Sequence, residues 1–80
     1  MHESHIRQAI VVKLRSGALP ATPPIKVWGG PARGQPCAAC DVNIERHTAE
    51  IEVDASDGCQ RAYHPACFQI LDSERRQHAR

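Results

Sequence analysis

The chain has 80 residues, of which 41% are hydrophobic, and it contains one Phe, one Trp and one Tyr. This length allows one small domain with a limited apolar core, which excludes a large enzyme with a deep pocket of its own. Such domains often need a disulfide, a metal ion or a partner subunit for stability. The net charge is +1, with +4 in residues 1–40 and −3 in residues 41–80, unlike the strongly basic profile of a dedicated DNA-binding protein.

The sequence shows no membrane-spanning or secretory segment. No stretch approaches the roughly 20 apolar residues of a transmembrane helix. The N-terminus lacks the cationic start and apolar stretch of a secretory signal. We therefore expect a cytoplasmic protein, in which paired cysteines are metal ligands or redox groups before they are structural disulfides.

Residues 1–17 are predicted to form an N-terminal amphipathic helix, running from about Ser4 to Ser16. Four apolar residues recur at helical spacing: Ile6, Ala9, Ile10 and Leu14. Ser4 is expected to cap the start, and Gly17 is well placed just past the end. Because an isolated helix of this length is marginal in water, it must pack on the rest of the chain, on a second copy or on a partner.

Residues 18–36 are predicted to form an extended connection rich in Pro and Gly. They hold five of the six prolines, which exclude a regular helix and a central strand. Ile25, Val27 and Trp28 are expected to lie over the domain, with Trp28 as an anchor into its core.

Residues 37–80 are predicted to be the domain proper, a small α+β unit held together by metal. Residues 49–54 alternate apolar and charged side chains, as in a half-buried strand, and Asp57-Gly58 predicts a two-residue hairpin turn. Such a turn places Asp54 opposite Arg61 as an ion pair. It also places Val53 opposite Ala62 and Ile51 opposite His64 on the inner face, with Tyr63 on the outer face.

A C-terminal helix is predicted to follow this hairpin. Pro65 suits the first turn of a helix, and the helix is expected to run to about Gln77. Asp72 and Arg76 lie one turn apart and are expected to pair on its outer side.

The cysteine spacing indicates a metal site. Cys37 and Cys40 are separated by two residues, and His64 and Cys67 repeat that spacing after 23 further residues. Three thiolates and one imidazole complete a tetrahedral shell, the closed arrangement of structural zinc. We therefore predict one structural Zn²⁺ held by Cys37, Cys40, His64 and Cys67.

Other interpretations of the cysteines remain. They are buried thiols beside a surface histidine, a reversible disulfide between Cys37 and Cys40, or an iron–sulfur site that uses all four cysteines. The redox interpretation lacks the expected strand–helix context, and the iron–sulfur site leaves His64 unexplained.

Cys59 and His47 are predicted to lie outside the metal site. Cys59 precedes His64 by five residues, and an odd offset in a strand points to the opposite face. We expect Cys59 to be an inert side chain near the hairpin. The alternative is a semi-exposed thiol, its only route to a redox role. His47 lacks a partner at the right spacing and is expected at the surface.

The residues in this half of the chain resemble a known family. Cys37 and Cys40, the Asp-Gly turn and the run Tyr63-His64-Pro65-Ala66-Cys67-Phe68 resemble the first zinc half of a LIM domain, and more broadly a treble-clef zinc finger. The resemblance covers about residues 35–72 and implies a knuckle, a β-hairpin and a helix around one zinc ion. Residues 69–80 contain no cysteine, so the second zinc site of a LIM domain is absent. The whole chain is also similar to small uncharacterised bacterial zinc-finger proteins, which brings no known activity.

These features favour a structural zinc module that mediates protein–protein interaction, through the N-terminal helix or as a homodimer. The alternative is a small nucleic-acid-binding transcriptional regulator that uses the basic first half, Arg33, and the tail arginines Arg75, Arg76 and Arg80. No set of nucleophile, base and orienting residue is readable, so we expect no enzymatic activity and no small-molecule substrate. A zinc or redox sensor that uses Cys59 is a further alternative.

Overall fold

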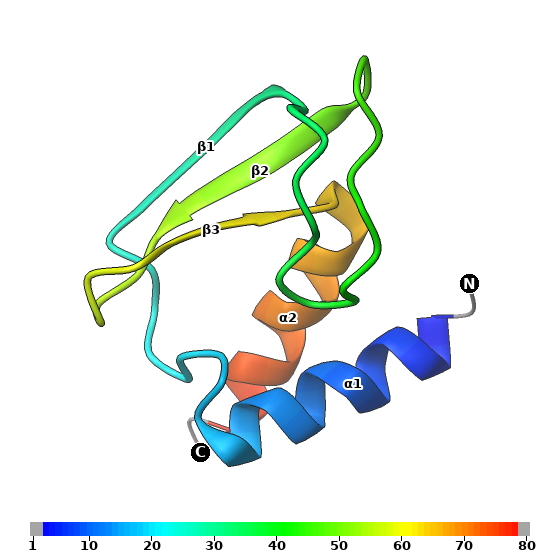
Figure 1. The fold of residues 1–80 in the computed structure, drawn as a ribbon. Coiled ribbons are helices and arrows are strands. Elements are labelled where there is room, and N and C mark those ends of the chain that lie inside the picture. The colour runs from blue at the N-terminus through cyan, green and yellow to red at the C-terminus, as the bar shows by residue number, and fades with distance from the viewer. Residues whose placement is uncertain (1–2, 79–80) are drawn as a thin grey trace.

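The computed structural model describes residues 3–78. A sheet, a helix that packs on it and a second helix that packs on the first lie in three successive layers (Figure 1). Along the chain these are α1 (Glu3–Ser16), β1 (Lys26–Pro31), β2 (Ala49–Asp54), β3 (Gln60–Tyr63) and α2 (Pro65–His78). The strands form an antiparallel sheet in the order β1-β2-β3. α2 packs on the sheet and α1 packs on α2, which confirms a small α+β fold. Within the described part of the chain, neither helix has the length and apolar character to cross a membrane.

α1 packs on the rest of its own chain. Ile10 and Leu14 are buried, whereas Val12 is 63% exposed on the opposite side. A guanidinium nitrogen of Arg7 lies 2.6 Å from a carboxylate oxygen of Glu74 on α2, which ties the two helices together. The helix already includes Glu3, so Ser4 is inside it and the predicted cap at Ser4 is wrong. Its end is as predicted, because Gly17 follows with a φ of 83°.

The proline-rich connection contains a strand that the sequence did not predict. β1 pairs with β2 along the sheet edge, where prolines are tolerated since only one row of hydrogen bonds is used. The expectation that this segment covers the domain is wrong at Ile25, which is 74% exposed, and at Val27, which is 44% exposed. Trp28 is half-buried, and its indole N–H donates to Glu52 on β2.

The hairpin between β2 and β3 has a different register from the predicted one. Its loop has three residues, because the Gly58 N–H donates to the Ala55 oxygen and Ala55 pairs with Cys59. Gly58 adopts a φ of 84°, so the Asp-Gly pair makes a tight turn followed by a bulge. The register therefore shifts by one residue, and Asp54 lies opposite Gln60 rather than Arg61.

The shift changes the partners of two side chains. Arg61 binds Asp57 across the loop at 2.8 Å instead of Asp54, and its guanidinium lowers the pKa of the Asp57 carboxyl to about 2. Tyr63 lies opposite Ile51 and is 1% exposed, so its predicted place on the outer face is wrong. Its ring packs on Phe68 of α2 with centroids 5.7 Å apart.

α2 agrees closely with the prediction. It begins at Pro65 and extends to His78, one residue beyond the expected end. The predicted pair on its outer side is confirmed, since Arg76 lies 2.9 Å from Asp72. The tail residue Arg80 lies outside the described residues.

A long loop between β1 and β2 positions the cysteine pair. Its two arms run alongside each other: the Ala32 N–H donates to the Thr48 oxygen, and the Ile44 N–H donates to the Gln35 oxygen, both at 2.8 Å. Figure 1 shows the loop passing in front of β3 and turning back near α1. The tip of the loop is attached to the sheet because the Ala38 N–H donates to the oxygen of Ala62.

Candidate metal centre

Four side chains from three parts of the chain meet below β3. Cys37 and Cys40 come from the loop tip, His64 from the junction of β3 and α2, and Cys67 from the first turn of α2. One sulfur or nitrogen atom of each lies within 4.8 Å of those of the others. The four residues that the spacing selects therefore form a cluster that can hold a metal ion.

The loop tip is a tight turn closed by backbone hydrogen bonds. The Asp41 N–H donates to the Cys37 oxygen, and the Cys37 N–H donates to the Val42 oxygen, both at 2.9 Å. Asp41 adopts the left-handed conformation with a φ of 68°, which Asp tolerates better than most residues. This turn points the two thiols in the same direction.

The second pair is held by the start of α2. The Phe68 N–H donates to the His64 oxygen at 2.9 Å, so His64 directly precedes the helix. Residues three apart at a helix start lie on the same side, which brings Cys67 beside the His64 ring. The backbone N–H of His64 also donates to the sulfur of Cys37 at 3.4 Å and so links the second pair of ligands to the first.

Two of the separations between donor atoms are close to those of a tetrahedral zinc shell. Nδ1 of His64 lies 3.5 Å from the Cys40 sulfur and 3.8 Å from the Cys67 sulfur. A tetrahedron with Zn–S of about 2.3 Å and Zn–N of about 2.0 Å places nitrogen and sulfur roughly 3.5 Å apart. Three sulfurs and one nitrogen are also the donor types that zinc prefers, so the residues present fit the ion.

The electrostatics of the cluster favour a bound cation. Burial raises the pKa of the Cys67 thiol, and the neighbouring Cys37 and Cys40 raise it further. Burial likewise raises the pKa of Cys40, with a smaller contribution from Cys37. Three thiolates this close repel one another, and a dication offsets that repulsion when the thiols release their protons to bind it.

No family model, curated protein or solved structure matches this chain. The resemblance to LIM domains and treble-clef fingers thus rests on the residues and their spacing in the sequence.

The two remaining candidates lie outside the cluster, as predicted. Cys59 is exposed at the hairpin, and His47 is exposed in the loop before β2. Neither belongs to the group of potential ligands found among residues 3–78.

α1 forms one wall of the centre, which the sequence did not indicate. A cavity of about 280 Å³ separates the helix from the cluster and is lined by Ile6, Cys40, Val42, His64, Ala66 and Cys67. Lys13, also on α1, donates to the Ala38 oxygen at 2.9 Å and the Ala39 oxygen at 3.1 Å, in the turn between the two cysteines. The only sequence signal for this contact is a lysine within an otherwise apolar stretch.

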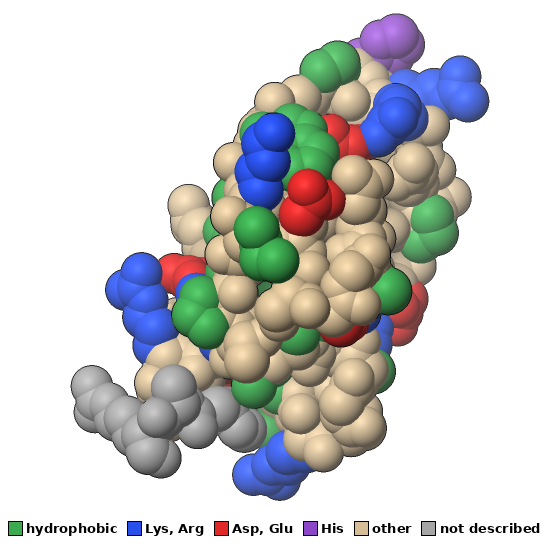
Figure 2. Space-filling view, turned by 90° about the vertical axis from the view of Figure 1, so that its left-hand side faces the viewer, with side chains coloured by type: hydrophobic (Ala, Val, Ile, Leu, Met, Phe, Trp, Pro, Cys, Tyr) green, Lys and Arg blue, Asp and Glu red, His purple; other side chains and the backbone are tan. Residues whose placement is uncertain are grey.

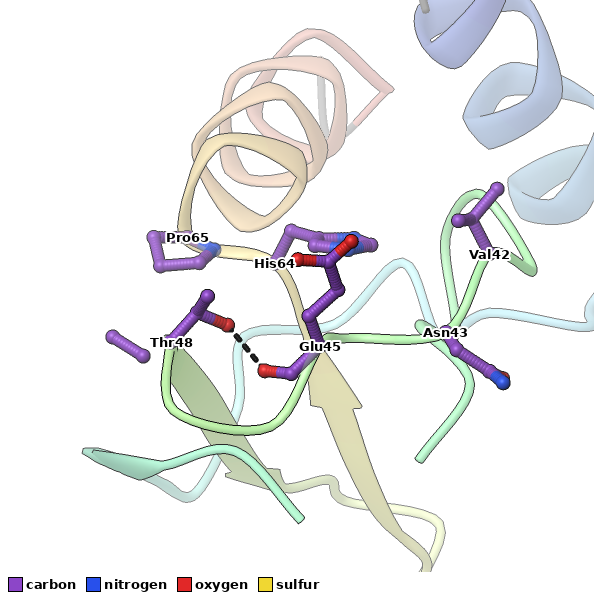
Figure 3. Close-up of a pocket in the computed structure, with 7 residues that line it drawn as sticks. Val42, Asn43, Glu45, Thr48, His64 and Pro65 are labelled. Carbon is purple, nitrogen blue, oxygen red and sulfur yellow. Dashed lines mark hydrogen bonds between the residues drawn. The ribbon is translucent and has the colours of Figure 1, made fainter. Parts of the chain in front are cut away.

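On the other side, His64 borders an open recess of about 410 Å³ (Figure 3). Figure 3 shows Glu45 and His64 among the side chains that line this recess. Thr48 holds the loop arm that carries Glu45 in place, because its hydroxyl donates to the backbone carbonyl oxygen of Glu45 at 2.6 Å. The histidine is therefore half-buried, between the sulfurs on one side and this recess on the other.

Proposed function

We propose that this chain is a structural zinc module in which Cys37, Cys40, His64 and Cys67 hold one Zn²⁺. The observation that carries the proposal is the meeting of these four donors within 4.8 Å, at separations that suit a tetrahedral ion. The ion would join the loop tip to the start of α2 and so connect two segments that are far apart in the sequence. Bound zinc supplies charge neutralisation and a rigid crosslink there.

The order of the elements supports a treble-clef arrangement. A cysteine turn, the β2–β3 hairpin and α2 follow one another, with one ligand pair at the turn and one at the helix start. This is the arrangement expected from the LIM resemblance, limited to its first zinc half.

We propose no catalytic role for the metal. Four protein ligands fill a tetrahedral shell and leave no position for water or substrate. Two of the sulfurs are also deeply buried, with Cys37 at 0% and Cys67 at 3% exposure. Free thiols and this ligand set suit a reducing compartment such as the cytoplasm.

For the module's activity, we propose protein–protein contact through the outer face of α1. Val11 and Val12 line a shallow groove of about 600 Å³ together with Arg7, Arg15 and Glu74. Val12 is 63% exposed, although burial of its apolar side chain would be favourable. An apolar strip between charged residues suits a protein partner or a second copy of the chain.

Nucleic-acid binding by the basic half stays a prediction with less support. Within the described residues, five of the arginines already pair with carboxylates: Arg7, Arg33, Arg61, Arg75 and Arg76. The ammonium group of Lys13 likewise forms an ion pair with Asp41. A cation that keeps its carboxylate partner contributes less net charge to a field that attracts the many phosphates of a nucleic acid.

Native mass spectrometry with metal analysis of the untagged protein tests the zinc assignment. We expect one zinc per chain in the wild type and in Cys59→Ser, and loss of zinc in Cys37→Ser and Cys67→Ser. Equal zinc content in all four proteins would contradict the assignment. The same spectra report the oligomeric state, and Val12→Glu should abolish any dimer while keeping the metal.

A further inference from the structure

A second recess, separate from the metal cluster in its lining, gathers positive charge. It has a volume of about 390 Å³ and lies where the chain leaves β1 and approaches β2; its lining residues are Pro31, Ala32, Arg33, Arg46 and His47. None of these five is acidic. Figure 2 shows Lys or Arg side chains beside a His at the upper end of the molecule, the end where Figure 1 places the close of β1 and the start of β2.

Arg46 is an unused cation in this recess. It forms no ion pair with any residue in 3–78, whereas five of the other described arginines do. Its side chain lies against the backbone of Gly34, where a Cβ would come within 3.2 Å of its Nε. Gly34 also has a φ of 83°, so its glycine provides both the turn and the space for the arginine.

Arg33 is held in position from two sides. Its backbone N–H donates at 3.1 Å to Glu50, a carboxylate that is only 1% exposed, and its guanidinium donates to Glu52. The Arg33 side chain is still 64% exposed, and a guanidinium has five N–H donors. The contact with Glu52 therefore orients the group and leaves other donors free.

His47 adds an imidazole to the lining of the recess. It adopts a φ of 73°, a left-handed conformation that His, like Asp, takes more often than most non-glycine residues. The neighbouring hydrogen bond from the Thr48 N–H to the Glu45 oxygen closes the turn that holds it there.

We propose that this recess binds a phosphate-type oxyanion, either free phosphate or a phosphate ester. Two arginines and a histidine line this recess, and none of its five lining residues carries a carboxylate. The carboxylates that bind Arg33, those of Glu50 and Glu52, are not among the lining residues. Arginine forks match the oxygens of a tetrahedral anion in pairs, which gives both charge and geometry. The site shares no residue with the metal cluster, so a failure of phosphate binding and a failure of the zinc assignment can be told apart.

The test is a titration of the metal-loaded full chain followed by ¹H–¹⁵N spectra. Inorganic phosphate, glycerol phosphate, dimethyl phosphate and, as a planar anion, acetate are added in turn, with sodium chloride at matched ionic strength as the reference. We expect saturable shifts at the amides of Arg33, Gly34 and His47 and at the side-chain Nε–H of Arg46. The probe that binds most tightly distinguishes a free phosphate, a monoester and a diester.

Arg46→Gln should weaken binding by about tenfold or more, because it removes a charge-assisted contact. The matched control is Arg15→Gln, which removes the same charge from an arginine on α1 that also has no ion pair among the described residues; it should leave affinity unchanged. Shifts no larger than those from sodium chloride would overturn the proposal. Equal weakening by both variants would overturn it too, since it would indicate a general charge effect. Acetate binding as tightly as phosphate would overturn the assignment to a tetrahedral anion.

Discussion

The ammonium group of Lys13 lies 2.8 Å from the carboxylate of Asp41 and joins α1 to the cysteine turn. The same nitrogen donates to the oxygens of Ala38 and Ala39 within that turn. A residue on the N-terminal helix thus stabilises the segment that presents two of the four potential metal ligands. α1 in this way packs as one unit with the cysteine cluster, although it lies far from it in sequence.

Replacing Lys13 by Met should loosen this connection. The two carbonyl contacts come from a side chain that is 20% exposed, whereas the Asp41 carboxylate is 78% exposed. We therefore expect Lys13→Met to lower the free energy of unfolding by about 1–3 kcal/mol and Asp41→Asn by less than about 1 kcal/mol. Denaturant titration of the metal-loaded proteins measures both values. Equal losses would show that the exposed ion pair, rather than the carbonyl contacts, holds the helix.

Removal of the metal should unfold the hairpin and α2. Structural zinc contributes about 10–16 kcal/mol apparent in finger peptides, which is comparable to the total stability of a small domain at about 5–15 kcal/mol. We expect a chelator to abolish the helical circular dichroism signal and the dispersed amide spectrum. Cys59→Ser, which leaves the cluster intact, should respond like the wild type. A spectrum that stays unchanged after the metal has left would refute this prediction.

Tyr63 should make the fold sensitive to alkaline pH. Burial raises the pKa of its phenol to about 12, above the usual value of 10.0. Since the folded state favours the neutral phenol, its stabilising contribution is complete below pH 10 and is lost as the pH rises from 10 to 12. The predicted loss is about 2–3 kcal/mol.

Ultraviolet absorbance follows this group alone, because Tyr63 is the single tyrosine. Its midpoint should lie near 12 in the folded protein and near 10 in denaturant. In Tyr63→Phe the extra loss of stability above pH 10 should disappear. A folded-state midpoint at the denatured value would contradict the buried position.

Gly58 should be required by the hairpin loop. Its φ of 84° is unfavourable for other residues, although a Cβ there would meet no atom within 4 Å. Gly58→Ala should therefore lower the free energy of unfolding by about 1–2 kcal/mol through backbone strain alone. Gly30→Ala is the matched control, since a Cβ there is equally uncrowded and the backbone is extended in β1. Thermal melts that show the same loss in both variants would argue against the bulged turn.

Several features could be predicted because they depend on residues close together in the sequence. The end of α1 at Gly17, the start of α2 at Pro65 and the Asp72–Arg76 pair follow from helix geometry over a few residues. The grouping of the four potential ligands was also predictable. The short spacing within each pair keeps its two side chains close together, so the fold has only to bring one pair next to the other.

Other features needed the tertiary structure. An Asp-Gly pair fits a two-residue turn or a three-residue turn with a bulge, and the choice between them moved Tyr63 from the surface into the core. β1 could not be predicted because its segment is rich in proline. An edge strand tolerates proline, since it forms hydrogen bonds with a neighbouring strand on one side only.

The sequence by itself determined the residue types and spacings that suit zinc, because ligand chemistry is local. The tertiary structure decided which distant groups meet. It brought Lys13 to the cysteine turn and placed Arg33 beside Arg46 and His47. Such contacts depend on how loops of different length pack on the sheet. The spacing of residues over a short stretch of sequence does not determine this packing.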